Sequence, residues 1–191
     1  MIKFLLASNN PHKLKELVDL GLNLEAAPKD LGIPETGSTF FENAKLKAQG
    51  YFDYYKKPSL ADDSGIIVEA LPDELWVSSA RFGGGNLSDL EKNQLLLKKL
   101  QGVEDRRAYF VCVLCFYINP EEVFFFEGRL NGSISLEIKG DGGFGYDPVF
   151  IPEDFADVTL SMMPDYKSKN SHRAKALNLA LQFFSKRNCQ N

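Results

Sequence analysis

The chain has 191 residues, a formal net charge of −4 and 44% hydrophobic residues. That length gives room for one large domain or two small ones with a sizeable core. The acidic balance argues against a broad nucleic-acid surface, which requires basic patches, and no apolar run approaches the roughly 20 residues of a membrane helix. We therefore expect neither a nucleic acid nor a membrane as a partner.

The N-terminal segment predicts a strand, a polar turn and a helix. Residues 3–7 indicate a buried first strand, and Pro11 suits the first position of the helix that follows. In this arrangement a helix N-terminus presents free backbone N–H groups to an anion. Ser8, Asn10 and Lys13 add a hydroxyl, an amide and an ammonium at the same place. An ordinary capped helix is the alternative interpretation.

A second helix is expected after a loop. Residues 22–38 are rich in Gly and Pro and predict a loop with one short extended piece. Thr39 and Glu42 then form a capping-box pattern that opens a helix over 40–55, and Pro58 follows its end.

The next segment, Asp62-Asp63-Ser64-Gly65, places two carboxylates side by side before an apolar strand over 66–70. Neighbouring side chains of an extended chain point to opposite faces, so Asp62 and Asp63 should have different roles. One can hold a divalent cation or activate a water, while the other braces a backbone or a second ligand. Asp-Asp-Ser-Gly is also favourable turn chemistry, and we expect the chain to turn there.

An irregular stretch over 71–85 carries Trp76 and a run of glycines. Ser88 and Glu91 form a second capping-box pattern, which opens a helix to about Leu100.

The character of the chain then changes to β-rich runs over 109–118, 123–128 and 133–138. Asn119-Pro120 and Asn131-Gly132 separate these runs and are strong turn signals. The short connections predict an antiparallel meander.

The cysteines Cys112 and Cys115 lie within the first of these runs, and Cys189 lies near the C-terminus. Residues three apart on a strand point to opposite faces, so the Cys-x-x-Cys pair is a poor metal or redox site. We expect core cysteines and a reducing, cytoplasmic location.

Residues 140–152 form a glycine-rich segment that ends in a strand over 149–151. Glycines allow close approach of the backbone to a ligand. Phe144 and Tyr146 offer flat faces, and Asp147 offers an acceptor. A glycine-rich turn into the final strand is the alternative.

The closing helix begins after Ser171, a plausible N-cap, so that His172 and Arg173 lie in its first turn. Cations there oppose the helix dipole, and a bound anion or polar ligand would remove the conflict. With Lys167, these side chains suit carbonyl or phosphate oxygens.

Four segments therefore point to one kind of ligand. The helix N-terminus with Lys13 suits phosphate, and Asp63 with a nearby acid suits Mg²⁺. Phe144 suits a planar ring, and the segment from Lys167 suits oxygens. Together they describe a nucleoside triphosphate with its metal, although the Walker A pattern is missing.

These motifs occur in one order along nearly the whole chain, and the chain resembles the inosine triphosphate pyrophosphatase family. The matching stretches are Ser8-x-Asn10-x-x-Lys13, residues 35–44, Ala-Asp-Asp-Ser-Gly at 61–65, Ser-Ala-Arg-Phe at 79–82, residues 142–150, and Ser-His-Arg-Ala-Lys-Ala-Leu at 171–177. Asn9 and His12 depart from the family pattern, in which glycines are common there, and Trp76 stands in a loop that lacks the usual Pro-Gly.

The resemblance implies hydrolysis of ITP, dITP and XTP between the α- and β-phosphates, which gives the monophosphate and pyrophosphate and removes these nucleotides from the pool. It also implies Mg²⁺, a homodimer and a single nucleoside triphosphate pyrophosphatase domain over 1–191. The implied fold is α/β: an elongated mixed β-sheet flanked by helices, with two lobes around a central nucleotide cleft.

Carried over residue by residue, the resemblance makes Asp63 and Lys13 catalytic, with Asp63 as the metal-site carboxylate and water activator. It makes Asp63 and Glu35 the metal ligands, although Glu42 and Asp62 are alternatives to Glu35. The residues implied in substrate binding are Ser8, Asn9, Asn10, Pro11, His12, Lys13, Ser64, Phe144, Gly145, Tyr146, Asp147, Lys167, His172 and Arg173.

Donors aimed at O6 of hypoxanthine or xanthine would meet the 6-amino group of adenine poorly. Guanine also carries O6, so its rejection needs a constraint at its 2-amino group. The alternatives to this function are a pyrophosphatase for pyrimidine or modified nucleotides, a non-catalytic nucleotide-binding regulator, and a nucleic-acid-binding protein that uses the aromatic meander.

Overall fold

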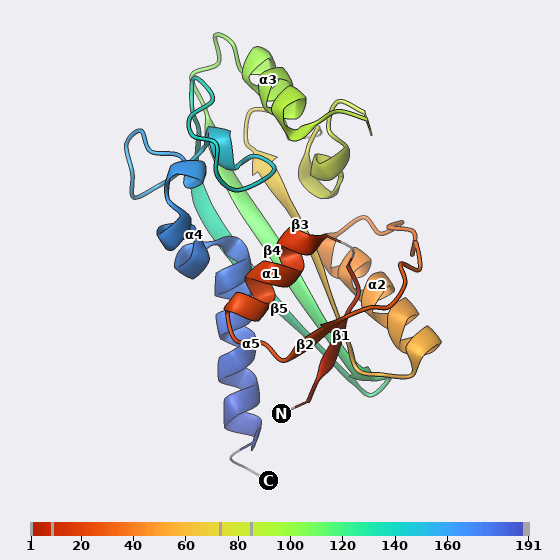
Figure 1. Ribbon diagram of the computed structural model, residues 1–191. Coiled ribbons are helices and arrows are strands. Elements are labelled where there is room, and N and C mark those ends of the chain that lie inside the picture. The colour runs from red at the N-terminus through yellow and green to blue at the C-terminus, as the bar shows by residue number, and fades with distance from the viewer. Residues whose placement is uncertain (1, 9, 73, 85, 189–191) are drawn as a thin grey trace. The chain divides into compact units, whose positions relative to one another are not determined.

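The computed structural model describes residues 2–8, 10–72, 74–84 and 86–188 (Figure 1). Asn9 and Cys189 lie outside the described residues. The chain divides into two compact units, and each is described by itself. Unit 1 comprises Met1–Ser64, Cys112–Gly128 and His172–Asn191, and unit 2 comprises Gly65–Val111 and Arg129–Ser171. The single domain expected over 1–191 stays a prediction.

Helices and strands alternate along most of the chain. In order, the elements are β1 (Phe4–Leu6), α1 (Pro11–Asp19), β2 (Leu24–Ala26), α2 (Phe40–Tyr55), β3 (Ser59–Val68), the 3-10 helix η1 (Trp76–Arg81), α3 (Asp89–Lys99), β4 (Arg107–Asn119), β5 (Glu122–Ile134), η2 (Asp147–Val149), β6 (Phe150–Pro152), η3 (Leu160–Met162), α4 (Pro164–Asn170) and α5 (His172–Asn188).

The strands form one sheet in the order β2-β1-β3-β4-β5-β6. The strand β1 is parallel to both β2 and β3, whereas β5 and β6 are antiparallel. The sheet is therefore mixed, and the predicted α/β fold with a mixed sheet and helices is confirmed. None of the helices in the described ranges combines the length and apolarity that crossing a membrane requires.

The core of unit 1 lies between its strands and the helices α1 and α5, which lie beside each other (Figure 1). Leu177 of α5 and Leu17 of α1 are fully buried in this core, together with Leu114 and Phe116 of β4. The ring of Phe4 meets the ring of Phe116 edge to face, with centroids 5.0 Å apart. Aromatic pairs of this geometry stabilise a core beyond the area that they bury.

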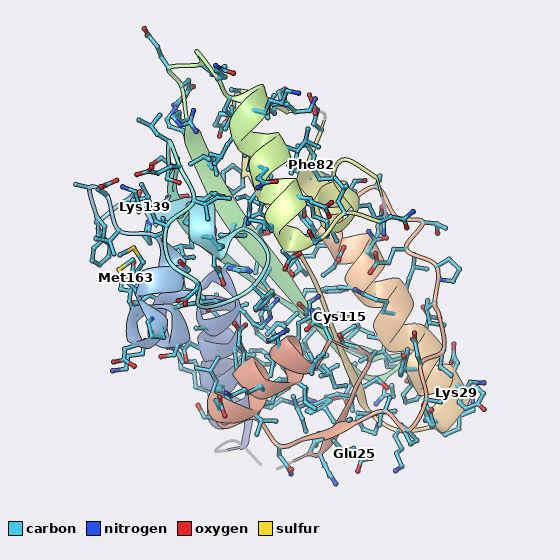
Figure 2. All side chains as sticks on the ribbon, turned by 45° about the horizontal axis from the view of Figure 1, so that its top comes forward. Glu25, Lys29, Phe82, Cys115, Lys139 and Met163 are labelled. Carbon is cyan, nitrogen blue, oxygen red and sulfur yellow. The ribbon has the colours of Figure 1, made fainter. Side chains whose placement is uncertain are left out.

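The cysteines of β4 belong to this interior. Cys112 and Cys115, the latter labelled in Figure 2, are free and fully buried. Burial raises the pKa of both thiols to about 12, so neither is a ready nucleophile or metal ligand. The prediction of core cysteines is confirmed.

The core of unit 2 surrounds Phe110, Phe150 and Leu96, with Phe82 and Tyr146 also buried in it (Figure 2 labels Phe82). Leu96 comes from α3, whose N-terminus carries the predicted capping box: Ser88 accepts from the Glu91 backbone, and Glu91 accepts from the Ser88 backbone.

The predicted turn at Asp62-Asp63-Ser64-Gly65 is wrong, because β3 runs through it without interruption from Ser59 to Val68. A strand can keep two buried carboxylates when cations on both of its faces compensate them, which local turn chemistry does not reveal.

The predicted turn at Asn131-Gly132 is also wrong. Both residues lie within β5, and the separate strand expected over 133–138 is absent from this described stretch because β5 continues to Ile134. A Cβ at Gly132 would lie 2.2 Å from the backbone oxygen of Ile151. Gly132 therefore permits the close approach of β6 rather than a reversal of the chain.

The helices expected after Pro11, Thr39, Ser88 and Ser171 are confirmed as α1, α2, α3 and α5. At α2, Thr39 accepts from the backbone of Glu42, but the Glu42 carboxylate accepts from Ser38 instead of returning to Thr39. The short helices η1 and α4 were not predicted, because their sequences lack a clear apolar period.

Replacement of Leu177 by Ala tests the unit 1 core. Leu177 is fully buried, so the loss of its side chain leaves a cavity and should lower the free energy of unfolding by about 2–5 kcal/mol. Leu179, on the same helix, is 48% exposed, and its replacement by Ala should change that energy by no more than about 0.5 kcal/mol. Urea denaturation of both variants measures the difference; equal losses would contradict the described packing of α5.

Candidate active site

Polar side chains at the N-terminus of α1 accept hydrogen bonds from the backbone N–H groups there. Asn10 is the N-cap, and its side-chain oxygen accepts from the backbone N–H of His12 at 2.9 Å. The hydroxyl of Ser8 accepts from the backbone N–H of Asn10 at 3.2 Å. Pro11 and His12 are exposed in the first turn. The alternative of a capped helix is thus realised, and the same turn still presents the partial positive charge that attracts an anion.

Asp62 is the most deeply buried charge of unit 1, with no exposed surface. Its Oδ1 lies 2.9 Å from Lys13 Nζ, and its Oδ2 accepts from Arg173 Nη2 at 3.0 Å. Burial alone would raise the pKa of this carboxyl, but Lys13, Arg173 and Lys47 outweigh it and hold the pKa far below its ordinary value. Asp62 therefore stays charged and fixes two cations from different helices.

Arg173 is 1% exposed and lies in the first turn of α5. Besides Asp62, its guanidinium donates to Glu16 of α1 and, at 3.2 Å, to the Ser64 hydroxyl. Gly128 lets this turn approach β5, since a Cβ there would lie 2.0 Å from the backbone oxygen of His172. The conflict of a cation with the helix dipole is relieved here by carboxylates of the chain itself.

Asp63 belongs to the same strand but has different partners, as expected for neighbouring residues of an extended chain. It is 6% exposed, and its Oδ1 lies 3.6 Å from Lys47 Nζ. Its Oδ2 is buried and has no hydrogen-bond partner within the described part of the chain. Burial raises the pKa of this carboxyl, and the attraction of Lys47 does not restore it. Asp63 is thus suited to accept a proton.

Lys47 of α2 lies at the centre of the carboxylate group. Its ammonium donates to Glu35 Oε1 at 2.8 Å and to the backbone oxygen of Asp62 at 2.6 Å. Burial acts to lower its pKa, but Asp62, Asp63 and Glu35 together raise it above the ordinary value. Lys47 therefore keeps its charge in a nearly buried position.

A cavity of about 240 Å³ opens at this place in unit 1. Its walls are Ala7, Ser8, Lys13, Asp30, Gly32, Ile33, Glu35, Lys47 and Tyr51. It thus joins the start of α1 with two ammonium groups and two carboxylates, a combination that suits phosphate oxygens and a hard cation.

The carboxylates considered as metal ligands have different surroundings. Glu35 and Asp63 share the Lys47 ammonium. Glu42 is occupied in the cap with Ser38, and Asp62 is held between two cations. Within the described ranges, no group of three or more His, Cys, Asp or Glu residues could hold a metal ion by itself. Mg²⁺ commonly takes one or two carboxylates and completes its shell with water and substrate phosphates.

The glycine-rich segment of unit 2 forms a second group. Asp147 Oδ2 accepts from the backbone N–H of Phe144 at 2.8 Å and from Lys167 Nζ at 2.6 Å. The Lys167 ammonium also lies 4.2 Å from the centre of the Phe144 ring. The hydroxyl of Tyr146 donates to the backbone oxygen of Ser79 at 2.7 Å. Residues 144–147, which we call the aromatic loop, are therefore fixed by specific side-chain contacts, which a plain turn would not need.

Comparison with known proteins gives consistent matches. A family model described as the Ham1 family matches residues 4–183. The dITP/XTP pyrophosphatase of Leptospira interrogans is 45% identical over 188 residues, which cover 93% of this chain and 94% of that protein. The chain belongs to the Ham1 family.

Solved structures agree with this assignment. The Staphylococcus aureus Ham1 protein matches with a TM-score of 0.85 and 36% identity, over 97% of this chain and 99% of that chain. A Mycobacterium abscessus structure, described as a nucleoside-triphosphatase and dITP/XTP pyrophosphatase, matches with a TM-score of 0.74 and 37% identity, over 94% and 99% of the two chains. The family resemblance read from the sequence motifs is confirmed.

The Ham1 motifs did not reveal every residue of the site. Lys47 was missed, and so was Asn43, which is buried and accepts from the Gly37 backbone N–H at 2.8 Å. Asn43, Lys47 and Tyr51 follow one another at four-residue intervals along α2. That spacing places them on one helix face, next to the buried Ala44 and Ala48. A polar stripe beside an apolar one was the signal that could have found them.

Glu16 was missed for a different reason. It contacts Arg173, which lies 157 positions further along the chain, and no local pattern encodes that pairing.

The two neighbouring aspartates should affect stability in opposite directions. Asp62→Asn leaves Lys13 and Arg173 without their shared counter-charge and should lower the free energy of unfolding by about 3–5 kcal/mol at pH 7. Asp63→Asn removes a carboxylate whose ionisation burial opposes, so it should raise the free energy of unfolding at pH 7.

The pH dependence follows from the directions of the pKa shifts. A carboxyl with a lowered folded pKa stabilises above its ordinary pKa of 3.8 and loses that contribution as pH falls below it, so the Asp62→Asn deficit should shrink in acid. A raised folded pKa gives the reverse sign, so the Asp63→Asn gain should appear as pH rises above 3.8. Urea denaturation at several pH values measures both; a shift of the same sign for both variants would contradict this description.

Proposed function

We propose that this protein hydrolyses dITP, XTP and ITP to the nucleoside monophosphate and pyrophosphate. The observation that carries the proposal is the unit 1 cavity, which is lined by Lys13, Lys47 and Glu35. Asp63 adjoins this cavity through Lys47, whose Nζ lies 3.6 Å from its Oδ1. The family relationship supports the reaction, since the Leptospira interrogans and Mycobacterium abscessus relatives carry the name dITP/XTP pyrophosphatase.

The triphosphate is bound by the positive groups of unit 1. Lys13 is held by Asp62 at one side of the cavity, and the N-terminus of α1 adds the partial positive charge of the helix dipole. Ser8 adds a hydroxyl, and Lys47 adds a second ammonium. Because the carboxylates hold these cations in place beforehand, little reorganisation is needed as charge develops on the phosphate oxygens.

Asp63 acts as the general base. Its raised pKa and its buried, unpartnered Oδ2 suit the removal of a proton from a water molecule. The water oxygen forms a bond to the α-phosphorus in line with the bridging oxygen, and the bond from the α-phosphorus to that oxygen breaks. Pyrophosphate leaves with the bond's electron pair, and the proton passes to Asp63. The monophosphate retains the base and the sugar.

Mg²⁺ is part of the proposal, with Asp63 and Glu35 as the residues that would hold it. The chemistry of this donor set fits, because carboxylate oxygens are the ligands that Mg²⁺ prefers and Glu35 lines the cavity beside Ser8 and Lys13. Bound there, the ion would supply charge neutralisation to the phosphate oxygens.

Base recognition is assigned to the aromatic loop of unit 2. Phe144 provides the stacking face, Tyr146 and Asp147 complete the wall, and Lys167 supplies a donor to O6 of the base. A base with a 6-amino group in place of O6 would leave such a donor unpaired. Arg173, whose guanidinium is engaged by Asp62 and Glu16, contributes by positioning and by charge.

We further propose a homodimer in the cytoplasm. Exposed apolar side chains such as Phe41 and Phe183 in unit 1 support association with a second copy. The free, buried cysteines of β4 support a reducing compartment.

The reaction is tested by incubating the protein with Mg²⁺ and ITP, XTP, GTP, ATP or UTP, and by resolving the products. Wild type should release pyrophosphate from ITP and XTP, and Asp63→Asn should lower kcat by about 10²–10⁴-fold, since it removes the base. Orthophosphate with a diphosphate product would contradict cleavage between the α- and β-phosphates. A preference for UTP would favour the pyrimidine alternative, and binding without turnover would favour the regulator.

Lys47 is tested by a matched pair of lysines on α2. Lys47→Met keeps the length of the side chain but removes the charge beside Asp63, and kcat/KM for ITP should fall about 10²–10³-fold. Lys45→Met changes an exposed residue of the same helix and should leave kcat/KM unchanged. Thermal unfolding of both variants verifies that they are folded; a folded Lys47→Met variant with full activity would remove Lys47 from the mechanism.

A further inference from the structure

Side chains of helix α3 bind both the backbone N–H and the backbone oxygen of Gly145 in the aromatic loop. The side-chain amide of Asn93 donates to the backbone oxygen of Gly145 at 2.9 Å, and the backbone N–H of Gly145 donates to Asp89 Oδ2 at 2.7 Å. Asp89 and Asn93 lie four residues apart, so they project from the same face of the helix. Together they hold the backbone of Gly145 by two hydrogen bonds.

Asn93 should lower the stability of unit 2 relative to an apolar residue if its only role is to fill the core. It is 2% exposed, and its Oδ1 is buried without a hydrogen-bond partner in the described part of the chain. An unmet buried acceptor costs about 1–3 kcal/mol, which an apolar side chain of similar shape would avoid. The amide is therefore better explained by its bond to Gly145 than by stability.

Gly145 needs this support because of its backbone conformation. Its φ of +63° lies in the left-handed region, and a Cβ there would meet no atom within 4 Å, so conformation rather than space requires glycine. A glycine in a loop has many alternative conformations. Two hydrogen bonds from a rigid helix select one of them.

The neighbours of Gly145 are the residues that face the base in the proposed function. Phe144 precedes it, with its backbone N–H bound to Asp147, and Tyr146 follows it, with its hydroxyl bound to Ser79. Rotation of the Gly145 peptide would therefore tilt the Phe144 ring against these fixed points. The contacts of α3 set that tilt.

We propose that Asn93 and Asp89 are specificity-determining positioning residues, which fix Phe144 through Gly145 and thereby set which purine bases are accepted. The inference rests on the proposed function, in which Phe144 stacks on the base. A fixed wall discriminates between bases that differ by one amino group, whereas a mobile wall adapts to each of them. The class of ligand favoured is a purine with O6 and without the 2-amino group of guanine.

The experiment compares wild type with Asn93→Leu in the pyrophosphate-release assay. Wild type should prefer ITP and XTP to GTP and ATP. In Asn93→Leu the ratio of kcat/KM for ITP to that for GTP should fall about tenfold, mainly through a higher KM for ITP. The melting temperature should not fall, because Leu removes the unmet acceptor along with the amide.

Asp89→Ala provides a second variant that does not endanger folding, since the Asp89 side chain is 53% exposed. It should change the same ratio in the same direction by a smaller factor. Leu90→Ala, at an exposed neighbouring position of α3, is the matched control and should leave the ratio unchanged.

The outcomes separate the two levels of the proposal. If Asn93→Leu keeps the wild-type ratio, whether or not its melting temperature falls, Asn93 has a structural role only and the inference is overturned while the proposed function stands. If wild type hydrolyses none of the four nucleotides, the proposed function and this inference both fail. A lowered ratio with an unchanged melting temperature supports the inference.

Discussion

The buried carboxylate of Asp62 is the interaction on which unit 1 depends. It has no exposed surface and is held between Lys13 of α1 and Arg173 of α5. A buried charge is tolerable only when it is compensated, and here the compensation joins a strand to two helices that are remote in sequence. The same contact positions the Lys13 ammonium at the cavity, so the ion-pair network that stabilises unit 1 also supplies the cation that the proposed function assigns to phosphate binding.

The strand β3 gives its two neighbouring acids, Asp62 and Asp63, different surroundings. Asp62 is held charged by two cations, whereas burial raises the pKa of Asp63, and one Asp63 oxygen has no partner in the described ranges. The alternation of side chains along a strand produces this difference between neighbours. Lys47 of α2 lies 3.6 Å from Asp63 Oδ1. Its raised pKa keeps the Lys47 ammonium charged at this position.

In unit 2, hydrogen bonds to backbone groups fix the conformation of the aromatic loop. Asp147 holds the Phe144 backbone, Tyr146 reaches Ser79, and Asn93 holds Gly145. Loops carry recognition in many proteins because a rigid scaffold supports them. The scaffold here is α3, which is itself fixed by its capping box and by the buried Leu96.

The sequence alone determined the family, the four long helices and the different surroundings of Asp62 and Asp63, because capping residues, apolar periods and strand alternation are local properties. It failed at Gly132 and at the supposed turn after Asp63, where the deciding neighbours come from distant segments. Only the tertiary structure decided that β3 continues through two acids and that Lys47 meets Asp63. Charge compensation and close backbone approach depend on residues far apart in the chain, and a local pattern carries no record of them.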